Sequence, residues 1–411
     1  MQVNQRRVMG HIGSLAQFNA TPGAGITRFS YSPQDAQARS YLLEQFSALD
    51  LPVQIDPLGN IRARYAGTDP TLPPLWVGSH IDSVRHGGMY DGVVGVVGAL
   101  EAVTVLSENG IRPRRSVEVV VFSEEEGSNF GTTMVGSKCL AGKLDLAGLE
   151  RLKDENGASC VQLAKAFGLH PEQVSNCRLS PGSVDAMVEL HIEQGIVLDR
   201  RQVRLGVVRA IAGMVTARIT VTGESNHAGA TPMDMRCDPM VSAAKLICRI
   251  QEIAAKECLP DTVATVGEIA CSPNMPNVIP GQVSFTVDIR DIHEEGMDKA
   301  LSLLREAMEQ TSAEDHTVFS LEMIGRSAPV AMTGRVVSAI REAAASCGVP
   351  YLEMNSGAVH DTAMLALLTD VGMIFVPSVD GKSHNPQEHT APEDIALGCQ
   401  ALLETVLRLT K

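Results

Sequence analysis

The strongest constraint on the fold is a short apolar strand that runs directly into a segment rich in histidine and aspartate. Leu75-Trp76-Val77 is followed by His80 and Asp82, and then by Asp91, which has glycines close by on both sides. If the extended geometry continues, His80 and Asp82 point to the same side of the chain. An imidazole binds divalent cations well, and a carboxylate two residues on can orient the ring. The pair alone is equally compatible with a solvated loop, so the interpretation depends on the other acids and histidines.

Two further predicted strands end in polar groups. Ser116–Phe122 is rich in β-branched residues, which predicts a buried strand, and Glu124-Glu125-Glu126 follows it. A later strand carries His191 between Glu189 and Glu193, which alternation places on one face. A run of charges is usually a solvated face, and a lone strand histidine is usually structural. Open α/β sheets nevertheless place their sites at the carboxyl ends of strands, and three adjacent buried carboxylates need a positive charge nearby.

Length and charge limit the class of protein. A chain of 411 residues is too long for one ordinary core, so we expect two domains. The net charge of −14 argues against nucleic acid or an anionic membrane as a partner, because both require basic patches. Nine cysteines without a Cys-x-x-Cys pair predict reduced thiols. No apolar run has the length of a transmembrane helix or the character of a signal peptide, so we expect a cytoplasmic protein.

The segment 93–106 is apolar on most faces and contains Gly95 and Gly98. Glycine is a poor choice for helix stability. The segment therefore predicts a buried helix whose neighbours come very close to it.

The pattern of the sequence changes near Gly213. From there the predicted order is strand, helix, strand, strand, helix, strand, which matches the split β-α-β ferredoxin-like motif. The predicted strands are 216–222, 263–269, 283–289 and 318–323, and the predicted helices are 238–256 and 294–311. We therefore expect an inserted domain at 213–327 within a first domain formed by 1–212 and 328–411. Such inserted modules usually hinge.

The chain then returns to an α/β pattern. A helix is predicted over 335–347, and the segment 356–361 predicts the start of another. Gly372–Val376 predicts a buried strand, which leads into a turn-rich loop containing His384.

Five candidate ligands fall at or just after predicted strand ends: His80, Asp91, Glu126, His191 and His384. Two metal ions bridged by one carboxylate need about this inventory, and nitrogen and oxygen ligands without thiolate suit Zn, Mn, Co or Ni. Spacing alone does not establish the site, because these residues are scattered over most of the chain.

Nine motifs, in order along the chain, give a more specific indication. They are GSHIDSV, GGxxDGxxG, EEEGSNF, ELHIEQG, GESNHAGATPM, PNVIPG, VDIRD, SGAxHD and SHNP. Together they resemble the amidohydrolase branch of the di-metal aminoacylase/carboxypeptidase family, which includes N-carbamoyl-L-amino-acid hydrolases, allantoate amidohydrolases and β-alanine synthases. The resemblance covers nearly the whole chain. It implies an α/β domain with a mixed sheet and helices on both faces, an inserted ferredoxin-like lid and dimerisation domain, and two divalent metal ions per subunit.

The resemblance also implies the roles of the metal ligands. Asp91 is the bridge. His80 and His191 complete the ligand set of one ion, and Glu126 and His384 that of the other.

Further roles follow from the same resemblance. Glu125 matches the general base, Asp82 matches the partner that orients His80, and Glu124 is left as a structural acid. The implied substrate contacts are Gln194, His227, Asn277, Arg290, His360 and Ser383. In the family a histidine like His227 stabilises the developing oxyanion and reaches the active site of the neighbouring subunit, so a homodimer is implied. The planar guanidinium of Arg290 suits a substrate carboxylate, although a strand-end arginine is often only a salt-bridge partner.

The predicted function is hydrolysis of the ureido C–N bond of an N-carbamoyl-L-amino acid, giving the amino acid, ammonia and carbon dioxide. Allantoate or ureidoglycolate remains an alternative substrate: GITRFSYSP and GSK resemble the allantoate enzymes, whereas GGMYDGVVGVVGALE, RCDPM and TVATVG favour the carbamoylases. Val359 replaces the Gly or Ala common in the family, which leaves the shape of the pocket open.

An aminoacylase or dipeptidase of the same fold is a further alternative. A binding protein with a decayed site is disfavoured, because every expected ligand is present.

Overall fold

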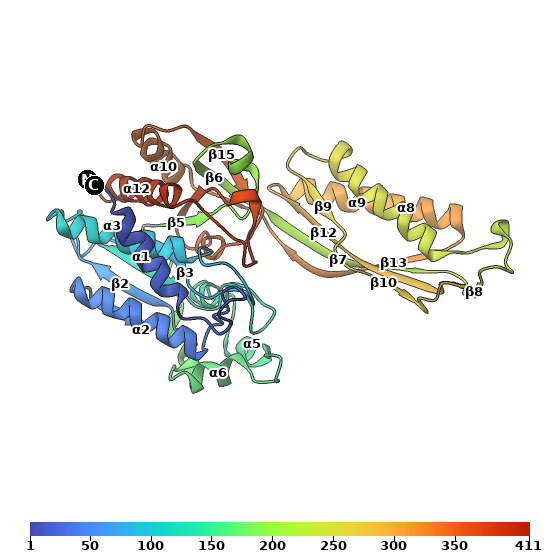
Figure 1. Cartoon of the computed structure of the whole chain (residues 1–411), viewed down its shortest axis with the longest axis horizontal. Coiled ribbons are helices and arrows are strands. Elements are labelled where there is room, and N and C mark those ends of the chain that lie inside the picture. The colour runs from blue at the N-terminus through green and yellow to red at the C-terminus, as the bar shows by residue number, and fades with distance from the viewer. The chain divides into compact units, whose positions relative to one another are not determined.

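The computed structural model describes residues 1–411, which divide into two compact units (Figure 1). The first unit comprises Met1–Arg209 and Met332–Lys411, and the second comprises Ala210–Ala331. The boundaries expected from the sequence, 213 and 327, lie a few residues inside the second unit. No helix combines the length and the apolar character that are needed to cross a membrane.

The first unit is built on a mixed sheet with the strand order β1-β2-β4-β3-β5-β16-β6, and β15 also pairs with β6. The four central strands β4, β3, β5 and β16 run parallel, while the pairs β1–β2, β2–β4 and β16–β6 are antiparallel. Parallel strands bring their carboxyl ends to one edge of the sheet. The strands are β1 (Val53–Ile55), β2 (Ile61–Tyr65), β3 (Leu75–His80), β4 (Val117–Phe122), β5 (Ala186–Ile192), β6 (Leu205–Ile211), β15 (Tyr351–Ser356) and β16 (Asp370–Val376).

Helices cover both faces of this sheet. Leu190 of β5 packs against α3 and α12, whereas Glu189, one residue earlier, accepts a hydrogen bond from Thr362 of α11. Because successive side chains of a strand point to opposite faces, α3 and α11 lie on opposite sides of the sheet. The helices are α1 (Gln5–Ala16), α2 (Pro33–Ala48), α3 (Val93–Glu108), α4 (Val135–Leu140), α5 (Leu146–Arg151), α6 (Cys160–Ala166), α7 (Val197–Arg201), α10 (Gly334–Ser346), α11 (Asp361–Leu365) and α12 (Pro392–Leu409).

The two glycines of α3 allow this helix to lie directly on the sheet, as the sequence predicts. A Cβ atom on Gly95 would collide with the carbonyl oxygen of Leu190 and would lie 2.6 Å from the Cβ of Ser79. A Cβ atom on Gly98 would lie 2.9 Å from the Leu190 side chain. Ser79 and Leu190 each immediately precede a predicted metal ligand, so the close contact of α3 fixes the position of both strand ends.

The second unit has the predicted order of elements. Its sheet has the order β10-β12-β7-β13, and β9 also pairs with β12. Alternate residues of β7, from Val215 to Val221, are buried against α8 and α9, which lie on one face of the sheet (Figure 1). The elements are β7 (Gly213–Thr222), β8 (Asn226–His227), α8 (Pro239–Glu252), β9 (Val263–Thr265), β10 (Ile269–Ser272), β11 (Val278–Ile279), β12 (Gln282–Asp291), α9 (Glu294–Asp315), β13 (Val318–Ser327) and β14 (Val330–Ala331).

Several boundaries differ from the sequence prediction. The strand predicted over 263–269 is divided into β9 and β10, with Gly267 in the break. β15 was not predicted, because the sequence Tyr351–Ser356 contains no β-branched residue and its strand depends on pairing with β6. β3 continues to His80, which lies on the strand rather than in a loop, because it pairs in register with Phe122 of β4.

We expect Gly95→Ala to destabilise the protein by about 1–3 kcal/mol, because the added methyl group would be forced against β5. Gly13→Ala in α1 is the matched control, since no atom lies within 4 Å of its new methyl group. There the substitution should stabilise by about 0.5–1 kcal/mol. Thermal unfolding of the two variants measures the difference, and equal shifts in Tm would contradict the close packing of α3.

Candidate metal centre

The carboxyl-terminal edge of the sheet brings the five predicted ligands together. His80 ends β3, His191 is the second-last residue of β5, and Asp91 lies in the loop between β3 and α3. Glu126 follows β4, and His384 lies in the loop after β16. The candidate ligand atoms form two groups within 4.8 Å, one of His80, Asp91 and His191 and one of Asp91, Glu126 and His384. Asp91 is the only member common to both.

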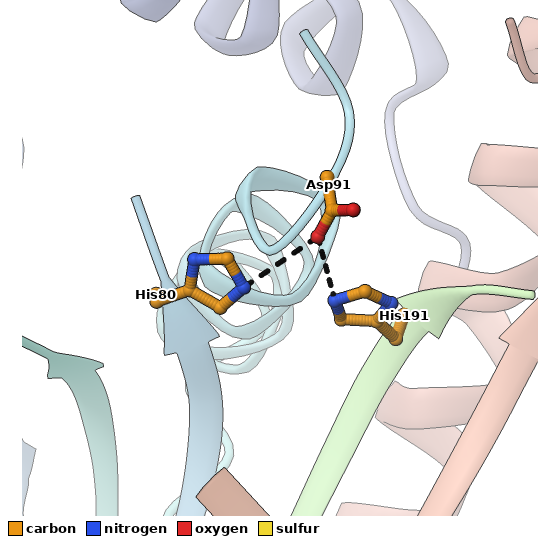
Figure 2. A group of neighbouring side chains, drawn as sticks. All are labelled: His80, Asp91 and His191. Carbon is orange, nitrogen blue, oxygen red and sulfur yellow. Dashed lines mark ion pairs between the residues drawn. The ribbon is translucent and has the colours of Figure 1, made fainter. Parts of the chain in front are cut away.

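The two carboxylate oxygens of Asp91 face different groups. Oδ1 lies 3.5 Å from Nε2 of His80 and 3.1 Å from Nε2 of His191 (Figure 2). Oδ2 lies 3.4 Å from Nε2 of His384, which is also 3.4 Å from Oε2 of Glu126. This division of the oxygens is what a carboxylate shared by two ions requires.

Both buried rings present Nε2 to the centre. Nδ1 of His80 lies 3.0 Å from the carbonyl oxygen of Asp82, and Nδ1 of His191 lies 2.8 Å from that of Ile192. A carbonyl oxygen only accepts, so each Nδ1 carries a proton and donates it. This arrangement is typical of metal-ligating histidines, whose second nitrogen is held by a backbone or carboxylate oxygen.

Asp82 contacts His80 differently from the predicted way. Its backbone carbonyl makes the hydrogen bond, while its carboxylate Oδ1 is 3.6 Å from the ring. Oδ2 accepts a hydrogen bond from the backbone N–H of Glu126 (3.1 Å). Asp82 therefore joins β3 to the acidic segment after β4.

The centre is short of positive charge. Burial raises the pKa of Glu126 to about 7, and the nearby Asp91 adds to the effect. Oε1 of Glu126 is buried and has no hydrogen-bond partner. Burial also acts to raise the pKa of Asp91, but His191, His384 and His80 outweigh it and hold this pKa well below its usual range. A divalent cation in each group would supply the missing charge, and imidazole and carboxylate ligands without thiolate suit Zn, Mn, Co or Ni.

Glu125 lies against the first ligand group. Its Oε2 is 3.7 Å from Nε2 of His80. Burial raises its pKa well above the usual range; His80 opposes this shift, while Asp361 and Glu126 add to it. A carboxyl group whose pKa is raised in this way is suited to hold and return a proton. Glu124, by contrast, accepts hydrogen bonds from the backbone and side chain of Asn129, in keeping with a structural role.

Three predicted substrate contacts lie in the first unit. Gln194 donates to Oδ2 of Asp91 (2.7 Å), and its buried Oε1 has no partner. The hydroxyl oxygen of Ser383 lies within hydrogen-bond distance of the same oxygen (3.0 Å). His360 is buried, with its ring packed edge-on against His191 at 4.5 Å between centroids. Gln194 and His384 both have left-handed backbone (φ 59° and 56°), a costly conformation that clusters at functional sites.

The other three predicted substrate contacts lie in the second unit. His227 is on β8, which pairs with β11, and Asn277 directly precedes β11. Arg290 is on β12, where its Nε donates to Asp288 (2.8 Å). The strand pairing thus brings His227 and Asn277 together.

Sequence reasoning missed Glu388. This buried carboxylate accepts hydrogen bonds from the backbone N–H groups of Tyr90 (2.9 Å) and Asp91 (3.2 Å) and from the hydroxyl of Ser383 (2.9 Å). Glu388 therefore links the backbone of Asp91, the shared candidate ligand, to the loop that carries His384. The only signal in the sequence is an acid four residues after that histidine.

The predicted polar face around His191 is only partly correct. Glu189 is close to His191 and His360, but its oxygens accept hydrogen bonds from Ser79 (2.6 Å) and Thr362 (2.5 Å). Glu193 lies beyond the end of β5 and accepts hydrogen bonds from the first N–H groups of α7, so its expected place beside His191 is wrong. β5 ends at Ile192, so the alternation of side chains between the two faces of the strand does not extend to Glu193.

The model of peptidase family M20/M25/M40 matches residues 76–408. The chain belongs to this family. An N-carbamoyl-L-amino-acid amidohydrolase from Paenarthrobacter aurescens is 40% identical over 405 residues, 98% of each chain. An allantoate amidohydrolase from Escherichia coli is 35% identical and covers 94% of each chain. A hydantoinase/carbamoylase family amidase from Burkholderia multivorans has a TM-score of 0.94 at 35% identity, covering 100% of this chain and 98% of the other.

These findings confirm the resemblance to the amidohydrolase branch and the predicted fold class. The M20/M25/M40 proteins are metal-dependent hydrolases, and this chain is a hydrolase with candidate metal-binding clusters of histidine, aspartate and glutamate.

We expect Glu388→Ala to weaken metal binding by about 10- to 100-fold, because it frees the backbone of Asp91 without removing a ligand. The neighbouring exposed residue provides the control, Gln387→Ala, which should bind metal normally. Titration against a chelating indicator measures both affinities. An unchanged metal affinity in Glu388→Ala would exclude a role for Glu388 in positioning Asp91.

Proposed function

We propose that this protein hydrolyses the ureido C–N bond of an N-carbamoyl-L-amino acid and releases the amino acid, ammonia and carbon dioxide. The observation that carries the proposal is the shared carboxylate of Asp91, which faces two ligand groups beside the buried Glu125. The names of the relatives, N-carbamoyl-L-amino-acid and allantoate amidohydrolases, support the choice of a ureido bond.

The proposed cofactor is two divalent ions per subunit. His80 and His191 would hold one, Glu126 and His384 the other, and Asp91 would hold both. When bound, such ions acidify water and polarise a carbonyl oxygen. Glu125 accepts the proton of the attacking water and returns it to the leaving nitrogen.

The amide of Gln194 favours a ureido substrate over an ordinary N-acyl one. Its Oε1 is buried and lacks a donor. A carbamoyl group carries N–H donors on both nitrogens, whereas an N-acyl group has none beyond the amide. The terminal –NH₂ of the substrate would donate a hydrogen bond to this oxygen. Leaving the oxygen buried without a donor costs about 1–3 kcal/mol of free energy. We propose that Arg290 and Asn277 of the second unit bind the substrate carboxylate, and that His227 donates to the developing oxyanion.

A substrate panel tests the proposal. With Mn²⁺ or Zn²⁺ added, we expect ammonia release from N-carbamoyl-L-amino acids to exceed that from allantoate, ureidoglycolate and N-acetyl amino acids. Preference for allantoate would move the assignment to the other ureido acid. Preference for the N-acetyl compounds would refute a ureido substrate.

We expect Glu125→Gln to retain its metal and to lose turnover by about 10²- to 10⁴-fold, because the amide cannot take up the proton. Metal content is measured by elemental analysis and turnover by ammonia release. Glu155→Gln, on the exposed surface of the same unit, is the control. Near-normal turnover in Glu125→Gln would exclude it as the base.

We also propose a homodimer in which His227 and Asn277 act in the partner's site. Glu125→Gln and His227→Asn subunits are each expected to be inactive alone. If His227 acts across the interface, unfolding and refolding the two together should restore about a quarter of wild-type activity, since half the dimers are mixed and each mixed dimer has one intact site. No recovery, with mixed dimers present by mass spectrometry, would show that His227 acts within its own subunit.

A further inference from the structure

The turn after β8 fixes the hydrogen-bonding state of His227. This side chain is exposed, so packing does not hold the ring. Its Nδ1 instead lies 3.1 Å from the backbone nitrogens of both Gly229 and Ala230, which donate to it. A backbone N–H can only donate, so Nδ1 must present its lone pair. The single proton of the neutral ring is then on Nε2.

Arg236 forms hydrogen bonds with both ends of this turn. Its Nη2 donates to the carbonyl oxygens of Ala228 (2.6 Å) and Thr231 (3.0 Å), and its Nε donates to Thr231 as well (3.1 Å). The hydroxyl of Thr231 in turn donates to the carbonyl oxygen of His227 (2.9 Å). The rigid fork of a guanidinium can bridge two carbonyl groups in this way, whereas a lysine ammonium is a single point.

The same turn is anchored to the second predicted substrate residue of this unit. Val278 and Ile279 of β11 pair with His227 and Asn226 of β8. The N–H of Ala228 donates to the carbonyl oxygen of Asn277 (3.0 Å). The backbone that orients His227 therefore also positions Asn277, and every contact involved lies within the second unit.

We propose that the turn 228–231 holds His227 as the neutral Nε2–H tautomer, and that Arg236 is the positioning residue that maintains the turn. With Nδ1 occupied by two donors, the ring offers one N–H and no accessible acceptor. The ring is therefore positioned to donate a hydrogen bond from Nε2 to a carbonyl oxygen as negative charge develops there. The identity of that acceptor rests on the proposed function, while the tautomer does not.

Nitrogen NMR of the full-length protein labelled with ¹⁵N-histidine tests the tautomer directly. The signals of His227 are those lost in His227→Gln. We expect an unprotonated Nδ1 and a protonated Nε2 at neutral pH in the wild type. A protonated Nδ1, in either the other tautomer or the imidazolium, would overturn the proposal. This readout stands even if no ureido acid is hydrolysed, so it separates failure of this inference from failure of the proposed function.

The role of Arg236 is tested with Arg236→Gln and Arg236→Lys, with Arg305→Gln on the exposed side of α9 as the matched control. We expect both Arg236 variants to show mixed tautomers and a kcat lowered by about tenfold or more, with KM changed much less, because an oxyanion donor acts mainly in the transition state. Arg236→Lys should not restore the tautomer or kcat, since a single ammonium group cannot take the place of the guanidinium that bridges the two carbonyl oxygens of the turn. Wild-type nitrogen shifts in both variants, or full rescue by lysine, would exclude the positioning role.

Discussion

The candidate centre depends on burying one carboxylate among three imidazoles. Asp91 is almost inaccessible to solvent, and each of its oxygens faces a different part of the cluster. A buried carboxylate is costly unless it is paired and hydrogen-bonded. Here the pairing groups come from strands and loops far apart in the sequence. The architecture of the first unit can be understood as the means of holding them around this one side chain.

Three local features keep Asp91 in place. A Cβ atom on Gly92 would lie 2.5–2.6 Å from the ring of His80, so only glycine lets the chain after Asp91 pass that ring. Directly beyond, α3 lies against the backbone of β5 because Gly95 has no side chain. In addition, the carboxylate of Glu388 accepts hydrogen bonds from the backbone N–H of Asp91 and from the hydroxyl of Ser383. Each feature acts through packing or hydrogen bonds and none supplies a ligand, so the geometry of the centre is set largely by residues outside it.

The sequence indicated the candidate ligands better than the residues that position them. His80, His191, Glu126 and His384 could be singled out because each lies at the end of an apolar strand or in the segment that follows one, and four parallel strands end at one edge. The motif resemblance then indicated which of three adjacent acids belonged to the centre. Glu388 gave no comparable signal, and Arg236 was noted only as the first residue of RCDPM, because both act through backbone groups that become neighbours only in the folded chain. Glu193 was misplaced because period-two alternation was carried past the end of β5.

The central claim is that Asp91 joins two cation sites. The most direct measurement is anomalous X-ray diffraction from crystals of the protein loaded with Mn²⁺ or Zn²⁺. The account predicts two anomalous peaks about 3.5–4 Å apart, one next to each carboxylate oxygen of Asp91. A single peak, or two peaks that do not share Asp91, would contradict it.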